Sequence, residues 1–168
     1  MIVSLIAAMS ENRVIGVQGR LPWHLPADIA NFRTVTLGKK FVMGRKSYEA
    51  EDKLCSETGN VIITRQEKYK VNKGDTTAHS LQHALELLQD EKEIFVLGGA
   101  EIFNQAIDRA DFIYITLVHN KFIGDTFFPE IDTDKWVILE EEDFEADAEN
   151  RHAYSFIKYG RNGSRLNS

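Results

Sequence analysis

The stretch EIFVLGGAEIF, residues 93 to 103, joins an apolar run to a helical pattern through two glycines. Residues 93 to 99 have the short, apolar composition of a buried strand, and a helix is expected from 100 to 107. Gly98 and Gly99 let the backbone turn sharply between the two elements. KFVMG, residues 40 to 44, leads in the same way into a helix expected at 45 to 50. Strands that run directly into helices are typical of a parallel sheet, because parallel strands need long crossover connections.

The same alternation extends along the rest of the chain. Further strands are expected at 2 to 9, 60 to 64, 111 to 118, 135 to 142 and 153 to 159, and further helices at 26 to 37 and 80 to 89. No helix separates the last two strands, so they are expected to pair antiparallel at an edge of the sheet. The sequence therefore predicts an α/β fold in which helices cover both faces of a mostly parallel sheet.

Length and composition set bounds on the domain organisation. With 168 residues, of which 43% are hydrophobic, the chain is long enough for one domain with a substantial core. We expect this domain to span residues 1 to 160 and the polar residues 161 to 168 to form a tail. The apolar run from Met1 to Met9 is too short to span a bilayer and lacks a basic flank. It predicts a buried strand and no membrane association.

Charge and cysteine content narrow the class of protein. The net charge of −6 lacks the basic footprint of a nucleic-acid-binding protein, which removes nucleic acid as a leading partner. The single cysteine, Cys55, cannot form an internal disulfide, and this favours a cytoplasmic location. The histidines show no metal-ligand spacing with Cys55, so no metal site is expected.

Three strand ends carry groups that suit an anionic ligand. These groups are Gly44, Arg45, Lys46 and Ser47 in FVMGRKS, Gly98 and Gly99 in FVLGGAEIF, and Thr64 and Arg65 in VIITRQ. Ligands of open α/β sheets bind outside the carboxyl ends of the strands, where free N–H groups and cations suit phosphate. Each junction alone is common in α/β proteins, and the glycine segments match neither G-x-G-x-x-G nor the Walker A motif. Their conjunction favours a phosphate-bearing dinucleotide.

Six segments of the chain occur together in a known family. They are AAMSENRVIG (7 to 16), LPWHLPADIANFR (21 to 33), TLGKKFVMGRKSYE (36 to 49), FVLGGAEIF (95 to 103), YIT (114 to 116) and GDTFFPE (124 to 130). In order and spacing they resemble bacterial dihydrofolate reductases, and the resemblance covers almost the whole chain. It implies a dihydrofolate-reductase-like fold, with an eight-stranded, mostly parallel sheet and an antiparallel carboxyl-terminal strand. It also implies NADPH as cofactor, reduction of dihydrofolate to tetrahydrofolate, and a cis peptide between Gly98 and Gly99.

The resemblance places the substrate around Asp28. In the family, a carboxylate at this position accepts hydrogen bonds from the pterin 2-amino group and ring N3, since it offers two acceptors in one plane. The residues implied in catalysis are Asp28, Trp23, Thr116 and Leu21. Those that match substrate contacts are Ile6, Ala8, Asp28, Ile29, Phe32, Leu97 and Thr116. Burial is expected to raise the pKa of Asp28, and the Thr116 hydroxyl to orient its carboxylate. Without the resemblance, Asp28 is an acid favoured by the helix dipole and Leu21 a packing residue.

Cofactor contacts carry over in the same way. The matching residues are Ala8, Ile15, Gly16, Gly44, Arg45, Lys46, Ser47, Thr64, Arg65, Gly98, Gly99, Ala100, Glu101 and Ile102. Arg45 and Arg65 are expected to converge on the 2′-phosphate that distinguishes NADPH from NADH. Residues 10 to 24 resemble the family's mobile loop over the nicotinamide, which we call the lid, and Asp125 matches a residue that hydrogen-bonds it. The resemblance also implies antifolate inhibitors as further ligands, and a monomer.

One loop departs from the family pattern. Between Glu49 and Asn60 this chain reads AEDKLCSETG, and Thr58 takes the place of an arginine that pairs with the α-carboxylate of folate's glutamate. Losing such a pair weakens binding by about 10- to 150-fold. Glu51 and Asp52 add negative charge there, and Lys53 offers only a point charge in compensation. Three interpretations stay open: dihydrofolate reduction with weakened recognition of the tail or a shift toward antifolate tolerance, reduction of a dihydropterin that lacks glutamate, and non-catalytic binding of a pterin or nucleotide.

Overall fold

The computed structural model describes residues 1–163, and within them ten strands and four α-helices form. The strands are β1 (Ile2–Ser10), β2 (Val14–Gly16), β3 (Lys40–Gly44), β4 (Asn60–Ile63), β5 (Thr76–Ala78), β6 (Glu93–Val96), β7 (Phe112–Val118), β8 (Thr126–Phe127), β9 (Trp136–Phe144) and β10 (Tyr154–Arg161). The helices are α1 (Pro26–Thr36), α2 (Arg45–Glu49), α3 (Leu81–Leu87) and α4 (Ala100–Ala106), and a 3₁₀ turn, Ile107–Arg109, extends α4. Every strand and helix expected from the sequence is present, with bounds shifted by a few residues at most.

Eight strands form one sheet in the order β5-β4-β3-β6-β1-β7-β10-β9, and β2 pairs with β8 in a separate ribbon. All pairs from β5 to β7 are parallel, whereas β10 is antiparallel to both β7 and β9. This confirms the predicted mostly parallel sheet with antiparallel strands at its carboxyl-terminal edge. The sequence did not predict β2, β5 and β8, because each is only two or three residues long and lacks an extended apolar run.

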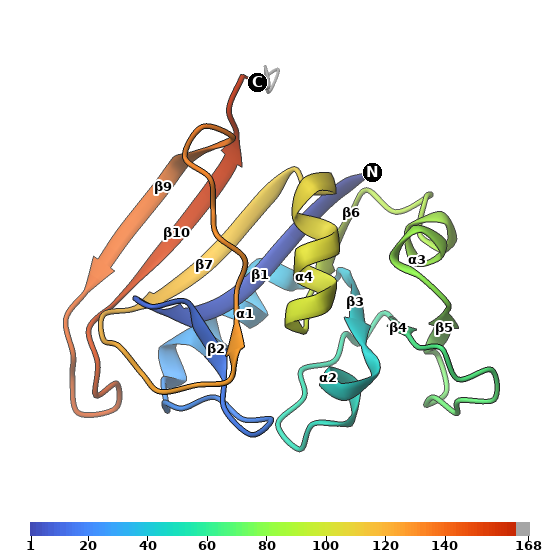
Figure 1. The fold of residues 1–168 in the computed structure, drawn as a ribbon, viewed down its shortest axis with the longest axis horizontal. Coiled ribbons are helices and arrows are strands. Elements are labelled where there is room, and N and C mark those ends of the chain that lie inside the picture. The colour runs from blue at the N-terminus through green and yellow to red at the C-terminus, as the bar shows by residue number, and fades with distance from the viewer. Residues whose placement is uncertain (164–168) are drawn as a thin grey trace.

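Helices cover both faces of the sheet, as predicted. In Figure 1, α4 lies in front of the sheet and α1 behind it. The front layer buries Leu85 of α3 and Phe103 of α4 against strand residues such as Leu5, Val42 and Ile113. The rear layer buries Phe32 of α1 and Tyr48 of α2. Each such buried apolar side chain contributes about 1.5–3 kcal/mol, so the two layers hold the helices against the sheet.

The carboxyl ends of the parallel strands point to the same edge of the sheet, the lower edge in Figure 1. The amino-terminal ends of α2 and α4 lie at this edge, because each helix follows its strand within four residues. The lid also lies there, since β2 belongs to it and follows the end of β1. This edge therefore gathers the segments that the sequence singled out.

The expected tail begins later than residue 161. Arg161 is the last residue of β10, and its guanidinium lies 4.4 Å from the centre of the Trp136 ring. It also donates hydrogen bonds of 2.8 Å to the carbonyl oxygens of Ile107 and Ala110. Arg161 thus belongs to the sheet, which corrects the expected boundary, and residues 164 to 168 of the expected tail lie outside the described residues. Within residues 1–163 no helix is both long enough and apolar enough to cross a membrane.

Candidate active site

Asp28 is positioned by the start of α1. Pro26 occupies the first turn, where a missing N–H costs nothing, and the N–H of Ala27 donates to Oδ1 of Asn150 at 3.0 Å. Asp28 then lies opposite the buried Thr116 of β7, whose hydroxyl donates to its carboxylate Oδ1 at 2.7 Å. Burial raises the pKa of Asp28, and the hydrogen bond from Thr116 partly opposes this rise. Both expectations for this acid are confirmed.

Asp28 lines a cavity of about 570 Å³, which we call the Asp28 cavity. Trp23, Ile29 and Leu21 line it as well. Trp23 is 8% exposed, and its Nε1 is a buried donor with no hydrogen-bond partner among the described residues. A buried unpaired donor is costly, so it indicates a site that a polar ligand or an ordered molecule completes. Asp28 thus offers a planar pair of acceptors at the cavity, and Trp23 of the lining has a buried donor without a partner among the described residues.

The other expected substrate contacts do not line this cavity, and Ile6 lines a separate cavity of about 400 Å³ together with Thr116. Ile6, Phe32 and Leu97 belong to the apolar layer under α1, and the Phe32 ring packs edge-on against Phe41 with centroids 5.5 Å apart. Ala8 pairs with Thr116 across β1 and β7. Leu21 on the lid, in contrast, is 37% exposed.

Gly44, Gly98 and Gly99, which we call the glycine junction, bring the starts of α2 and α4 together. The N–H of Gly44 donates to the carbonyl of Gly98 at 2.8 Å, and the expected cis peptide between Gly98 and Gly99 is present. Gly98 has a φ of +109°, and a Cβ there would lie 2.8 Å from Cε2 of Phe103. A Cβ on Gly99 would lie 3.7 Å from Oγ of Ser47. The bare backbone suits close approach by a phosphate-bearing cofactor, so these residues fit NADPH.

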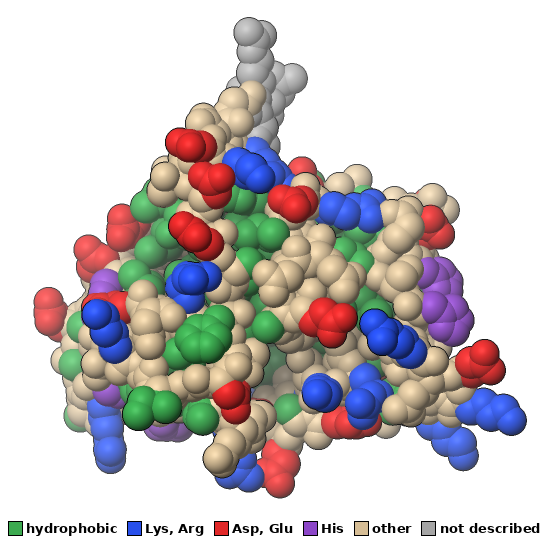
Figure 2. Space-filling view, viewed as in Figure 1, with side chains coloured by type: hydrophobic (Ala, Val, Ile, Leu, Met, Phe, Trp, Pro, Cys, Tyr) green, Lys and Arg blue, Asp and Glu red, His purple; other side chains and the backbone are tan. Residues whose placement is uncertain are grey.

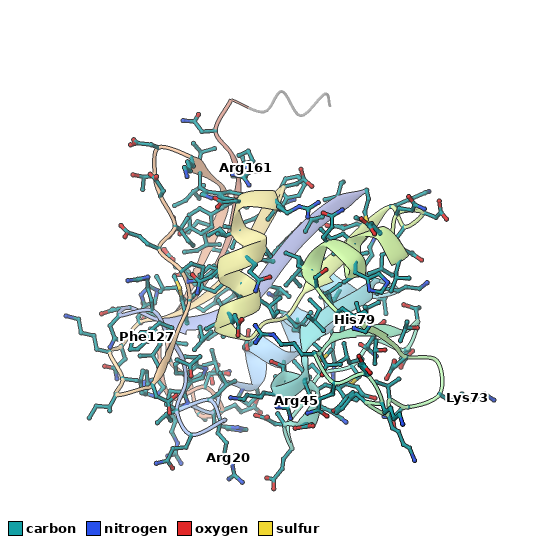
Figure 3. All side chains as sticks on the ribbon, turned by 45° about the vertical axis from the view of Figure 1, so that its right-hand side comes forward. Arg20, Arg45, Lys73, His79, Phe127 and Arg161 are labelled. Atoms are coloured by element: carbon teal, nitrogen blue, oxygen red, sulfur yellow. The ribbon has the colours of Figure 1, made fainter. Side chains whose placement is uncertain are left out.

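Among the remaining expected cofactor residues, the two arginines each pair with an acidic side chain. Arg45 Nη1 pairs with Glu49 Oε2 at 2.9 Å, and Arg65 Nη2 lies 3.9 Å from Glu101 Oε1 with both side chains exposed. Tyr69 and Arg45 together lower the pKa of Glu49. Thr64 is buried at the end of β4, and its Oγ1 accepts the N–H of Gln66. Arg45 lies at the lower edge of the molecule in Figure 3, below His79.

Three further helix residues and two lid residues complete the expected cofactor set. Ala100 and Ile102 lie in the first turn of α4, and Ile102 packs within 3.4 Å of the position of a Cβ on Gly44. Ile15 and Gly16 lie in β2. Lys46 lies in the first turn of α2, so the structure gathers these residues at one edge of the sheet.

The GDT segment, residues 124 to 126, contacts the lid. Asp125 Oδ2 accepts the N–H of Gln18 at 2.9 Å, which confirms the expected contact, and this hydrogen bond is the main reason that the pKa of Asp125 is lowered. Gly124 packs directly on the lid, since a Cβ there would lie 2.2 Å from Cγ1 of Val14. No larger residue fits at Gly124 without displacing β2.

The lining of the Asp28 cavity extends beyond the substrate contacts expected from the sequence. Gln18, Gly19 and Arg20 of the lid line the Asp28 cavity, as do Glu49, Ala50, Glu51 and Asp52 at and after the end of α2. Figure 2 shows the surface hollowed at the lower centre, where Figure 1 places the lid and α2 on either side. Glu51 and Asp52 depart from the family pattern in this loop, but no sequence signal related them to Arg20.

Comparison with known proteins agrees with this geometry. The sequence model of dihydrofolate reductase matches residues 2–161. The chain belongs to the dihydrofolate reductase family. It is 38% identical over 161 residues to dihydrofolate reductase type 3 of Salmonella typhimurium, covering 96% of this chain and 99% of the relative. It is 35% identical over 162 residues to the dihydrofolate reductase of Bacillus subtilis, covering 96% of each.

A solved member of the dihydrofolate reductase family shares the fold. It is the enzyme from Enterococcus faecalis complexed with NADP(H) and RAB-propyl, with a TM-score of 0.87, 32% sequence identity and 96% coverage of each chain. The family resemblance inferred from six short segments is therefore confirmed across the chain.

Proposed function

We propose that this protein reduces 7,8-dihydrofolate to 5,6,7,8-tetrahydrofolate with NADPH as the reductant. The observation that carries the proposal is Asp28 in its cavity, hydrogen-bonded to Thr116 and with Trp23 on the same cavity lining. α2 connects this cavity with the glycine junction, since Ser47 faces Gly99 and Glu49 lines the cavity. Membership of the dihydrofolate reductase family supports the same reaction.

Asp28 orients the pterin. Its two carboxylate oxygens accept hydrogen bonds from the 2-amino group and N3 of the ring, while Thr116 holds the carboxylate in place. Burial strengthens these charge-assisted bonds, because less water competes for the oxygens. The carboxylate also polarises the pterin toward uptake of a proton at N5, through water at the cavity.

The cofactor residues hold NADPH with its nicotinamide beside the pterin. When bound, NADPH supplies a hydride to C6 of the pterin. The backbone at Gly98, Gly99 and Ala100 and the hydroxyl of Ser47 would hold the pyrophosphate, and Arg45 and Arg65, now paired with Glu49 and Glu101, would supply positive charge for the 2′-phosphate. The lid, with Leu21, closes over the nicotinamide and excludes water from the transfer.

The proposal extends to the location, oligomeric state and ligands of the protein. An exposed single cysteine, Cys55, suits a reducing compartment, so we place the protein in the cytoplasm, and we propose that it acts as a monomer. Dihydrofolate and antifolate-type pterin analogues are its proposed small-molecule ligands. Because Thr58 replaces the arginine that pairs with the glutamate tail, a dihydropterin without glutamate is a second candidate substrate.

One assay compares these substrates directly. NADPH oxidation is followed with dihydrofolate and with 6-methyl-7,8-dihydropterin, on the wild type and on Asp28→Asn. Turnover of dihydrofolate that falls by at least about 100-fold in Asp28→Asn supports the proposal. Preference for the tail-less pterin selects the second substrate, and tight NADPH binding without turnover of either pterin refutes catalysis.

A further inference from the structure

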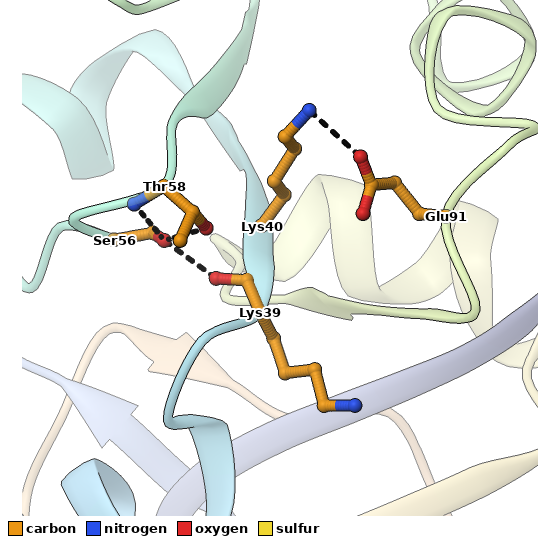
Figure 4. Close-up of polar contacts among 5 residues, drawn as sticks. All are labelled: Lys39, Lys40, Ser56, Thr58 and Glu91. Carbon is orange, nitrogen blue, oxygen red and sulfur yellow. Dashed lines mark hydrogen bonds and ion pairs between the residues drawn. The ribbon is translucent and has the colours of Figure 1, made fainter.

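The substrate's glutamate tail needs a cation, and the residue at the usual place cannot supply one. Thr58 lies in a tight turn in which its N–H donates to Oγ of Ser56 at 3.1 Å. The Ser56 hydroxyl in turn donates to the carbonyl of Lys39 at 2.5 Å, as Figure 4 shows. This turn is closed by neutral groups, so a carboxylate finds no charge at Thr58.

Neighbouring lysines are engaged elsewhere. The Lys39 side chain points away from Thr58 in Figure 4, and its Nζ lies 3.6 Å from Oε2 of Glu93. Lys40 Nζ pairs with Oε1 of Glu91 at 2.7 Å. Lys53 Nζ lies 4.4 Å from the centre of the Tyr48 ring. None of these lysines lines the described Asp28 cavity.

The charges on the cavity lining single out a different residue. Among the described lining residues, Arg20 is the one lysine or arginine, against the carboxylates of Asp28, Glu49, Glu51 and Asp52. Arg20 Nη2 lies 2.8 Å from Oε2 of Glu51, and these two side chains are 72% and 85% exposed. Asp28 is partly buried, so Arg20 and Glu51 mark the outer end of the same cavity. Figure 3 shows Arg20 at the lower edge of the molecule.

We propose that Arg20 binds the carboxylate of the substrate's glutamate tail, and that Glu51 holds Arg20 when no substrate is present. The inference rests on the proposed function, because it assumes a substrate that enters the cavity with its pterin at Asp28. A guanidinium binds a substrate carboxylate with the same two-pronged geometry that it uses for a glutamate side chain. The exchange is easy, since an ion pair between such exposed side chains is weak and the released Glu51 returns to water.

This exchange compensates for the missing arginine. It transfers the recognition of the tail from the loop before β4 to the lid, so that substrate binding and lid position become coupled through Arg20. The acidic residues of the loop then have a role: Glu51 keeps Arg20 at the cavity in the free enzyme rather than repelling the substrate outright.

The test uses Arg20→Gln and Glu51→Gln with two substrates, dihydrofolate and the tail-less 6-methyl-7,8-dihydropterin. Arg20→Gln should raise the KM for dihydrofolate by about three- to tenfold, as expected for one exposed charged contact. It should leave the KM values for the tail-less pterin and for NADPH unchanged. Glu51→Gln should lower the KM for dihydrofolate by about two- to fivefold, because the competing carboxylate is gone. Both effects should shrink in 0.5 M salt.

Two control variants test whether a cation other than Arg20 binds the tail carboxylate. Lys53→Gln and Arg33→Gln each remove one positive charge from an exposed position outside the cavity lining and should leave the dihydrofolate KM unchanged. The inference is overturned if either of these variants raises that KM while Arg20→Gln does not. It is also overturned if Arg20→Gln affects both pterins equally, which indicates an effect on the lid alone. A wild type that reduces neither pterin refutes the proposed function itself, and the inference with it.

Discussion

Removing the Thr116 hydroxyl with Thr116→Val isolates the contact that orients Asp28. The substitution preserves shape and deletes one hydrogen bond of 2.7 Å to a carboxylate. Hydrogen bonds to charged groups contribute about 1.5–3 kcal/mol, and because Asp28 is only partly buried we expect the lower end. The expected loss in kcat/KM for dihydrofolate is therefore about tenfold. Thr116→Ser keeps the hydroxyl and should stay within about twofold of wild type.

The pH dependence gives a second, independent readout of the same change. The Thr116 hydroxyl lowers the pKa of Asp28 against the larger rise from burial, so its removal raises that pKa further. The limb of the kcat/KM profile that reports Asp28 should move to higher pH in Thr116→Val and not in Thr116→Ser. A raised acid pKa costs stability once the pH exceeds the ordinary value of 3.8, so the variant should lose more unfolding free energy at pH 7 than at pH 3. Wild-type activity and an unmoved limb in Thr116→Val would refute the assigned orientation.

Three further changes test other parts of the site. Gly98→Ala combines a φ of +109° with a Cβ 2.8 Å from Phe103, so thermal unfolding should show a loss of about 1–3 kcal/mol, and unaltered stability would contradict the close packing. Asp125→Asn weakens the contact with Gln18, so the NADPH Kd, measured by fluorescence titration, should rise severalfold. In the wild type this contact should persist above pH 3.8 and weaken as the pH falls through the lowered pKa of Asp125. Thr58→Arg introduced into Arg20→Gln should return the dihydrofolate KM at least to the wild-type value, and no change would mean that the tail does not reach this turn.

The sequence predicted those parts of the fold that have strong local signals. Long apolar runs such as residues 111 to 118 can be recognised from composition alone, because buried parallel strands expose no polar face. The two-residue β8 and the three-residue β5 carry no such pattern, and they form only because neighbouring elements offer them hydrogen-bonding partners. Arg161 was assigned to a polar tail, since no local pattern signals that its guanidinium stacks on Trp136.

The residues of the candidate site also differ in how far the sequence could predict them. Asp28 and Thr116 stood out through the resemblance, and their hydrogen bond was anticipated. Asn150, which accepts the N–H of Ala27, lies 123 residues away along the chain, and no local signal relates the two. The pairing of Arg20 with Glu51 depends on how two irregular loops meet, which periodicity cannot predict.

Isotope transfer tests the central claim most directly. Single-turnover reduction of dihydrofolate with [4,4-²H₂]NADPH is followed by mass spectrometry and NMR of the product, on the wild type and on Asp28→Asn. We predict one deuterium at C6 of tetrahydrofolate in the wild type, formed at least about 100-fold more slowly in the variant. Absence of label at C6, or equal rates for the two proteins, would contradict the claim that Asp28 holds a pterin beside the reduced nicotinamide.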